Sequence, residues 1–248
     1  MGTVEQEYDP NDVYIYGVVG NNLGVYKTGV TAQYNSKNGQ SVGIQVLNSS
    51  LDSIGKQNNF EYNAYWYGSL VKGKVLPFMS ATTILGTNTT SVTPYVINLG
   101  VQWVFDRMKI DTDYSVAHNM PNFYQNTTYT SVPVKILFDG DHFKPAFKYI
   151  YNKVKADDPL IIQDNEQNFT AISELDSHTF ELALQYYPIK NKNLRVHLMG
   201  AYTTDQQLSQ LTPNTGNNSF SRSHLDSQIQ VIAGIRIGFD VLKGLSNL

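Results

Sequence analysis

The segment DSQIQVIAGIRIGF at residues 226–239 decides the predicted fold, because it alternates strictly between two kinds of side chain. One side of the extended chain would carry the apolar residues Ile229, Val231, Ala233, Ile235, Ile237 and Phe239. The other side would carry Gln228, Gln230, Gly234, Arg236 and Gly238. A period of two predicts a β-strand. Soluble sheets use strands of about 5–6 residues, whereas a tilted strand needs about 9–11 to cross a bilayer, so the length favours a membrane strand.

The composition suits a wall that is apolar outside and polar inside. Of the 248 residues, 41% are hydrophobic and 16% are charged, against usual shares of about 45–50% and about 25%. The chain also contains 17 Tyr and 11 Phe. Barrels and sandwiches of about 200–250 residues often form one domain. A soluble two-sheet sandwich also alternates in this way and is an alternative.

Charge and cysteine content exclude several other classes of protein. A formal net charge of −3 provides no basic face for nucleic acid, so we expect no nucleic-acid partner. The absence of cysteine excludes disulfides and thiolate chemistry. No apolar run approaches the ~18 residues of a transmembrane helix. The acidic start, with Glu5, Glu7 and Asp9, lacks the basic and apolar regions of a signal peptide.

Alternating patterns recur along the chain and are separated by residues that favour turns. About twelve strands are predicted, at 13–19, 25–34, 41–47, 60–70, 74–84, 92–105, 108–117, 128–138, 142–154, 175–187, 194–203 and 224–240. Residues 1–11 are expected to form a flexible lead-in, 12–240 a single barrel domain, and 241–248 a tail.

After the first hairpin, the connections between these strands alternate in length. Short turns are predicted at 35–40, 71–73, 106–107, 139–141 and 188–192, and long ones at 48–58, 85–91, 118–127, 155–174 and 204–222. Bacterial outer-membrane barrels have short periplasmic turns and long external loops. The predicted fold is therefore an all-β, transmembrane, up-and-down antiparallel barrel of about twelve strands. Its last strand is expected to pair with the first, near 13–19.

Aromatic residues support the predicted barrel, whereas three prolines argue against it. Six aromatic residues adjoin short turns and are expected to form a girdle at the periplasmic rim: Tyr34, Phe105, Phe138, Phe143, Tyr186 and Phe239. The alternative is that aromatic residues simply favour strands. Pro94, Pro133 and Pro145 fall inside predicted strands, where proline removes a hydrogen-bond donor, so we expect them to mark bulges.

Three segments carry a resemblance to a known family: VGIQVLNSS at 42–50, INLGVQWVFDRMKIDTDYSVAHN at 97–119 and FELALQYYPIKNKNLRVHLMGAY at 180–202. Their strand, turn and strand pattern resembles Gram-negative outer-membrane porins and, more loosely, the phosphate-selective O/P-type branch. The resemblance implies an outer-membrane location, contact with lipid, and a monomer or homo-oligomer. Those porins have more strands and usually end on the aromatic residue, whereas residues 241–248 follow Phe239, and no family binding residue can be carried over.

The alternation also places charged side chains inside the predicted barrel, whose lumen would be narrow. The predicted pore-lining residues are Lys27, Glu61, Lys109, Asp111, Asp113, Lys135, Lys144, Lys148, Glu181, Arg195 and Arg236. Basic rings in a pore favour anions, which predicts passage of small polar or anionic solutes. The alternative is that these charges pair with one another and stiffen or plug the lumen.

No catalytic constellation emerges from the sequence. The histidines form no H-E-x-x-H pair, and there is no G-x-S-x-G elbow. We expect no enzymatic activity, no metal and no cofactor. The predicted function is an outer-membrane channel for passive diffusion of small hydrophilic solutes or ions. The alternatives are a surface-binding or adhesive barrel and a barrel hydrolase.

Overall fold

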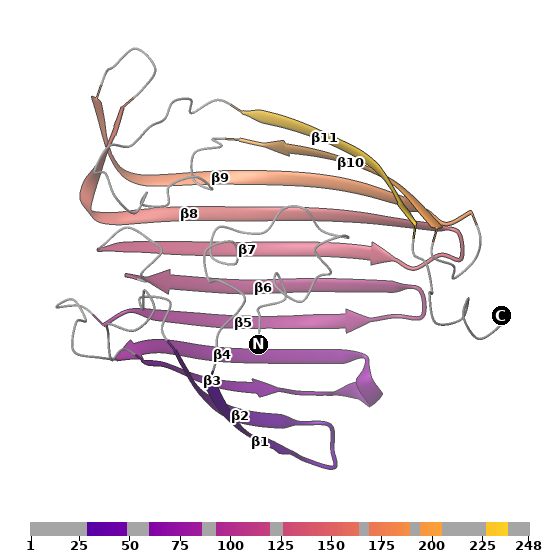
Figure 1. Cartoon of the computed structure of the whole chain (residues 1–248), viewed down its shortest axis with the longest axis horizontal. Helices are drawn as coiled ribbons and strands as arrows, with labels where there is room; N and C mark the ends of the chain where they lie inside the picture. The colour runs from indigo at the N-terminus through magenta and orange to yellow at the C-terminus, as the bar shows by residue number, and fades with distance from the viewer. Residues whose placement is uncertain are drawn as a thin grey trace, which may run out of the picture.

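The protein forms one antiparallel sheet of eleven strands, each hydrogen-bonded to the next along the chain (Figure 1). The computed structural model describes residues 29–48, 60–85, 93–119, 126–163, 169–188, 194–204 and 227–237. The strands are β1 (Gly29–Asn35), β2 (Ser41–Asn48), β3 (Phe60–Tyr67), β4 (Val75–Leu85), β5 (Tyr95–Val104), β6 (Met108–His118), β7 (Thr127–Phe138), β8 (Phe143–Gln163), β9 (Phe169–Tyr186), β10 (Leu194–Thr203) and β11 (Gln228–Ile237).

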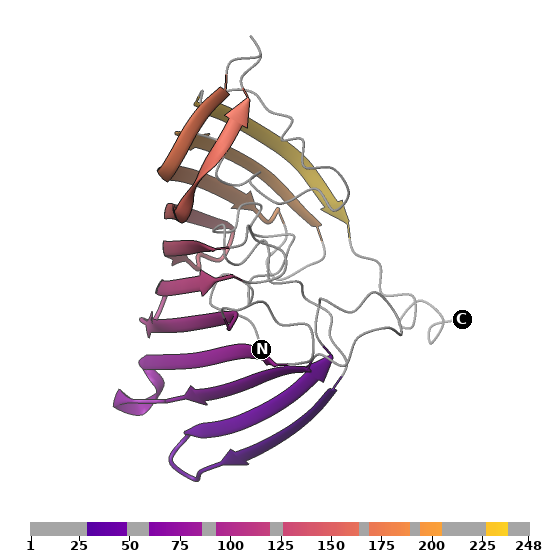
Figure 2. The ribbon, with the colours of Figure 1, turned by 90° about the vertical axis from the view of Figure 1, so that its left-hand side faces the viewer.

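The up-and-down order confirms the predicted strand sequence from the second predicted strand to the last. The sheet curves into an arch with a convex and a concave face (Figure 2). Among the described strands, β1 and β11 are the two edges, and no described pair joins them. The predicted closing strand at 13–19 lies outside the described residues, as do Lys27, Phe239, the lead-in and the tail.

The short turns gather at one end of the sheet, on the right in Figure 1, which we call the short-turn end. Gly39 supplies the positive φ of 75° that the β1–β2 turn requires. The β3–β4 turn contains the 3₁₀ segment η1 (Val71–Gly73). Its three residues all have positive φ, including the β-branched Val71 at 51°, which is a rare conformation for such a side chain. The opposite end of the sheet is called the far end.

The predicted long loop at 155–174 is wrong, because β8 continues to Gln163 and β9 begins at Phe169. Their pairing resumes at Leu160 with Ile172 and runs to Gln163 with Phe169. A register shift between Lys155 and Leu160 places extra residues in β8, as in a bulged strand. Acidic residues and Pro159 make this stretch look like a loop in the sequence, but the two segments satisfy each other's backbone groups. The resulting hairpin extends past the other strands at the far end (Figure 1).

The prediction that three prolines mark bulges is also wrong. Pro94 lies just before β5. Pro133 pairs with Ile150 and Pro145 with Leu184, in registers that run on unchanged around them. The β6–β7 ladder leaves out two pairs beside Pro133 and resumes in the same register, because proline has no N–H to donate. In the described part of the chain, no helix is long and apolar enough to cross a membrane.

Candidate functional site

The convex face of the sheet is an exposed apolar surface. Exposed aliphatic side chains occur along the arch, from Ile44 on β2 through Leu99 on β5 and Leu182 on β9 to Ile235 on β11. A soluble monomer rarely exposes an apolar patch of more than a few hundred Å². This surface therefore requires an apolar environment or a partner.

Aromatic residues border the apolar surface at both ends. At the short-turn end, Tyr34, Phe105, Phe138, Phe143 and Tyr186 are exposed, and Phe143 stacks on Tyr186 with ring centroids 4.8 Å apart. We call them the turn-end aromatic band, which confirms the predicted placement of these five residues. A second set, the far aromatic band, was not predicted. It consists of Phe60, Tyr62, Tyr95, Tyr149, Tyr151, Phe180 and Tyr202.

The separation of the two aromatic bands can be followed on β5. Phe105 follows Tyr95 by ten residues, and both side chains are exposed. Ten steps of about 3.3 Å, tilted by about 40°, correspond to the ~25 Å apolar height of outer-membrane barrels. Beyond the far band, an exposed ion pair joins Lys153 to Glu174. The convex face thus changes from apolar to aromatic to charged along the strands.

On strands β1–β5, the concave face combines buried apolar side chains such as Tyr65 and Ile84 with neutral polar groups, and it is almost uncharged. The Asn63 side chain donates a hydrogen bond to Gln45 over 2.8 Å and accepts one from the Thr82 hydroxyl over 3.2 Å. These side-chain hydrogen bonds link β2, β3 and β4. Asn98 continues this pattern by donating to Ser80 over 2.9 Å. Glu61 is the one predicted pore-lining residue on these strands, and it is buried. Neutral amides and hydroxyls bury at lower cost than charges when they are hydrogen-bonded.

The concave face of β6–β9 carries a transverse row of four charges, which we call the charged row. Asp111 pairs directly with Lys135, Lys135 with Lys148, and Lys148 with Glu181, on four neighbouring strands. Their exposed fractions are 1%, 3%, 2% and 3%. Gln102 on β5 donates to Asp111 over 2.7 Å. Two lysines directly opposite each other repel, and the acids at the two ends of the row balance them.

The burial of the charged row helps to decide whether these four residues line a pore or instead interact with one another inside the sheet. Side chains this deeply buried do not contact bulk water, and Oε2 of Glu181 accepts no hydrogen bond from the described residues. Next to the charged row, on the side of the short-turn end, lies an apolar cluster of Ala146, Ala183 and Met199, against which Leu137 and Ile232 pack. Two buried acids and two buried lysines in one row, with no formal net charge and an apolar layer beside them, favour the interpretation that these charges stiffen the sheet.

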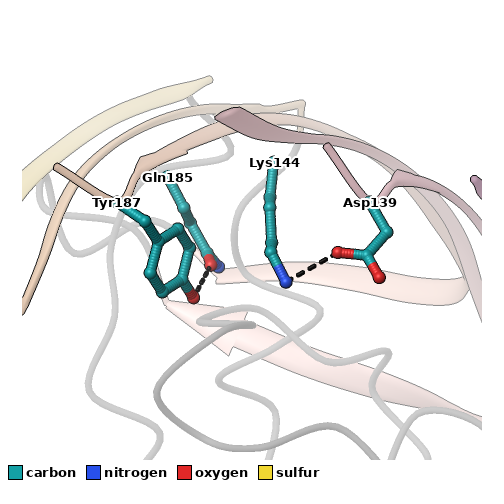
Figure 3. A network of polar contacts seen from close by, with 4 residues as sticks. All are labelled: Asp139, Lys144, Gln185 and Tyr187. Carbon is teal, nitrogen blue, oxygen red and sulfur yellow. Dashed lines mark hydrogen bonds and ion pairs between the residues drawn. The ribbon is translucent and has the colours of Figure 1, made fainter. Parts of the chain in front are cut away.

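A second polar network lies on the concave side at the short-turn end (Figure 3). Lys144 forms an ion pair with Asp139 over 2.6 Å and lies 5.2 Å from the centre of the Tyr187 ring. The Tyr187 hydroxyl donates to Gln185 over 3.0 Å. We call these four residues the mouth network. Unlike the charged row, it is reached by water, since the Lys144 and Asp139 side chains are 32% and 65% exposed.

Asp113, Arg195 and Lys109, which were also predicted to line the pore, lie on the same concave face. Asp113 and Arg195 are buried, whereas Lys109 is exposed. The backbone of Arg236 lies directly opposite Arg195 in the β10–β11 register. The structure thus brings Asp111, Lys135, Lys148 and Glu181 into one row and leaves Lys144 in a separate place. A pore-lining role for any of them stays a prediction.

Comparison with known proteins supports the fold. No protein-family model matches the chain, and no curated protein matches it. The solved structure of the outer membrane channel DcaP of Acinetobacter baumannii is similar, with a TM-score of 0.53 at 12% sequence identity. The fold resembles that of an outer-membrane channel. The similarity covers 71% of this chain and 55% of that one, so this chain spans about half the length of DcaP. The comparison supports the porin-like resemblance and not the looser O/P-type one.

Two features of the site were not predicted from the sequence. The far aromatic band was missed because its members precede or follow long connections whose bounds were uncertain, although the Tyr and Phe at those strand ends were a usable signal. The mouth network was not predicted in part because Asp139 lies in a turn, outside the predicted strands, and Tyr187 is the last residue of the strand predicted at 175–187. A carboxylate five residues before a lysine across a tight hairpin turn would have indicated the contact.

Proposed function

We propose that this chain is an outer-membrane channel for passive diffusion of small hydrophilic solutes or ions, with a preference for anions. The observation that carries the proposal is the convex face, where an apolar surface of membrane height lies between two aromatic bands. Such a surface suits lipid, while the opposite face offers hydrogen-bonding and charged groups to water. The short turns would lie on the periplasmic side and the far end outside the cell. The similarity in fold to an outer membrane channel supports this proposal.

We further infer that solutes do not pass over the charged row. Their path would follow the polar positions of the concave face that water reaches, such as Gln33 on β1 and Lys144 at the short-turn end. Water-accessible basic groups at that end, Lys109 on β6 and Lys144 on β8, would favour anions. This requires a closed barrel, and the strand predicted at 13–19 is the proposed partner of the edge strands.

The test is single-channel recording of the full chain refolded into planar lipid bilayers. We expect stepwise conductance, and a reversal potential under a KCl gradient that indicates anion preference. Purification without detergent would contradict the membrane location. A detergent-dependent protein that inserts into bilayers without conducting would contradict the channel alone.

One observation favours a second function, binding at the cell surface. The β8–β9 hairpin extends past the far aromatic band, where only its two strands pair with each other. Hairpins that project from a rigid sheet can present a recognition surface. Deletion of residues 158–172 separates the two proposals, because a channel would keep its conductance and an adhesive barrel would lose its partner.

We infer that the protein is not an enzyme. His118 contacts Thr128 over 2.9 Å, and His178 contacts the Tyr149 hydroxyl over 2.8 Å. His142 contacts the backbone carbonyl of Tyr187 over 2.9 Å. Each of these contacts joins neighbouring parts of the sheet. Within the described ranges, no group of three or more His, Asp or Glu side chains could hold a metal ion. An esterase and peptidase screen of the refolded protein should remain at background.

A further inference from the structure

We propose that Asp139 is an internal counter-ion that weakens anion preference at the short-turn mouth by occupying Lys144. The inference rests on the proposed channel function and names the residue that sets its charge preference. The charged row is buried, whereas the Asp139–Lys144 pair is open to water. A diffusing ion responds most strongly to charges that it can approach. The mouth network is therefore a group of concave-face charges that a diffusing ion can approach.

The hairpin turn brings the two charges together. Asp139 directly follows the last residue of β7, and Lys144 is the second residue of β8. The Asp139 N–H donates to the Arg107 carbonyl over 2.8 Å, which anchors the turn to the neighbouring β5–β6 turn. Both side chains lie beneath the arch, on the concave side (Figure 3). The contact is thus a consequence of backbone geometry and does not depend on a flexible loop.

Lys144 is held from the opposite side by an uncharged group. The Tyr187 ring lies 5.2 Å from its ammonium group, and a ring face attracts a cation without cancelling its charge. Gln185, the cross-strand partner of Lys144, accepts from the Tyr187 hydroxyl. The Tyr187 backbone is fixed by its N–H, which donates to the His142 carbonyl over 2.8 Å. Lys144 therefore keeps its position when the carboxylate is removed.

The Asp139 carboxylate occupies the position that a passing anion would take. An ammonium group 2.6 Å from a carboxylate oxygen has its charge locally neutralised. If Asp139 becomes uncharged, Lys144 regains an unpaired positive charge at the mouth. The ligand class is a small mobile anion, and chloride is the simplest probe.

The experiment compares ion preference in Asp139→Asn, Lys144→Gln and the double variant in planar bilayers. Asp139→Asn should raise the chloride-to-potassium permeability ratio about two- to five-fold, the range that an exposed ion pair supports. Lys144→Gln should lower the ratio, because it leaves Asp139 unpaired. The double variant should lose the increase seen in Asp139→Asn. An equal increase in the single and double variants would overturn the proposal, because the effect would then not act through Lys144.

Glu174→Gln is the matched control. It removes the same charge from the Lys153–Glu174 ion pair, which joins β8 to β9 at the far end and on the convex face. It should leave the permeability ratio unchanged. An Asp139→Asn variant that does not differ from Glu174→Gln and the unmodified protein would also overturn the proposal.

A second measurement does not require conductance. An anionic, amine-reactive reagent such as trinitrobenzenesulfonate should label Lys144 about two- to five-fold faster in Asp139→Asn, with Lys153 as the internal reference by mass spectrometry. Unchanged labelling of Lys144 would overturn the inference. A protein that never conducts but shows faster labelling would contradict the channel function and leave the role of Asp139 supported.

Discussion

Strands β1–β5 and β6–β11 share one concave face but cover it with different chemistry. On β1–β5, amides and hydroxyls bond to one another from strand to strand, as in the chain from Gln45 through Asn63 to Thr82. On β6–β9, the register aligns Asp111, Lys135, Lys148 and Glu181 in one row. Hydrogen bonds therefore link neutral groups across the strands of one half, whereas charged groups lie side by side in the other half. The two halves differ in how much the free energy of unfolding falls when one side chain is removed. The loss is modest for a neutral amide and large for a buried charge.

The largest effect is expected in the charged row. Glu181→Gln leaves two adjacent buried lysines with one carboxylate and should lower the free energy of unfolding by about 3–5 kcal/mol. Urea unfolding in lipid vesicles, followed by the fluorescence of Trp66 and Trp103, measures the change. Adding Lys148→Met to this variant should recover much of the loss. If Glu181→Gln costs less than about 1 kcal/mol, the row is not a closed, paired layer.

The next effect tests whether the two halves are alike on the convex face. Arginine at Ile44 on β2 or at Leu182 on β9 should each cost about 2–4 kcal/mol, the penalty for a charge near the bilayer midplane. The same unfolding assay applies. Tyr202→Arg, in the far aromatic band, is the control and should cost about 0–1 kcal/mol. Tolerance of arginine at Ile44 alone would mean that β1–β5 does not face lipid.

A smaller effect is expected from the neutral chain. Asn63→Ala removes the hydrogen bonds to Gln45 and Thr82 and should cost about 1–3 kcal/mol. Ser131→Ala, which loses its 3.0 Å bond to Asn152 in the other half, should fall in the same range. Neither variant should alter the reversal potential. A loss for Asn63→Ala as large as that for Glu181→Gln would remove the proposed difference between the halves.

The smallest effect concerns the mouth network. Tyr187→Leu removes the ring beside Lys144 and should cost about 0.5–1 kcal/mol, whereas Tyr187→Phe keeps the ring and should differ little from the unmodified protein. Unfolding measurements on both variants separate the ring from its hydroxyl. Equal losses in the two variants would assign the stabilisation to the hydrogen bond with Gln185.

Strand positions were largely predictable, because a period of two needs only local information. The predicted strand at 194–203 matches β10 residue for residue, and Ile229, Val231 and Ile235, predicted to share one apolar side of the last strand, are all exposed. The extension of β8 to Gln163 and the start of β9 at Phe169 were not predictable in this way. These two segments form strands because each supplies the backbone hydrogen-bond partners of the other. Likewise, Pro133 looked like a bulge although its neighbours keep the register.

The sequence by itself determined the class of fold and the two faces of the wall, since alternation, turn residues and the low share of charged residues are properties of the chain alone. Tertiary structure decided which charges meet. Lys144 and Lys148 are equivalent in the sequence, as inward lysines on one strand, but only the register with neighbouring strands buries Lys148 beside Glu181 and leaves Lys144 in water beside Asp139. The physical reason is that cross-strand contacts join residues far apart in the chain, and their pairing cannot be read from either strand alone.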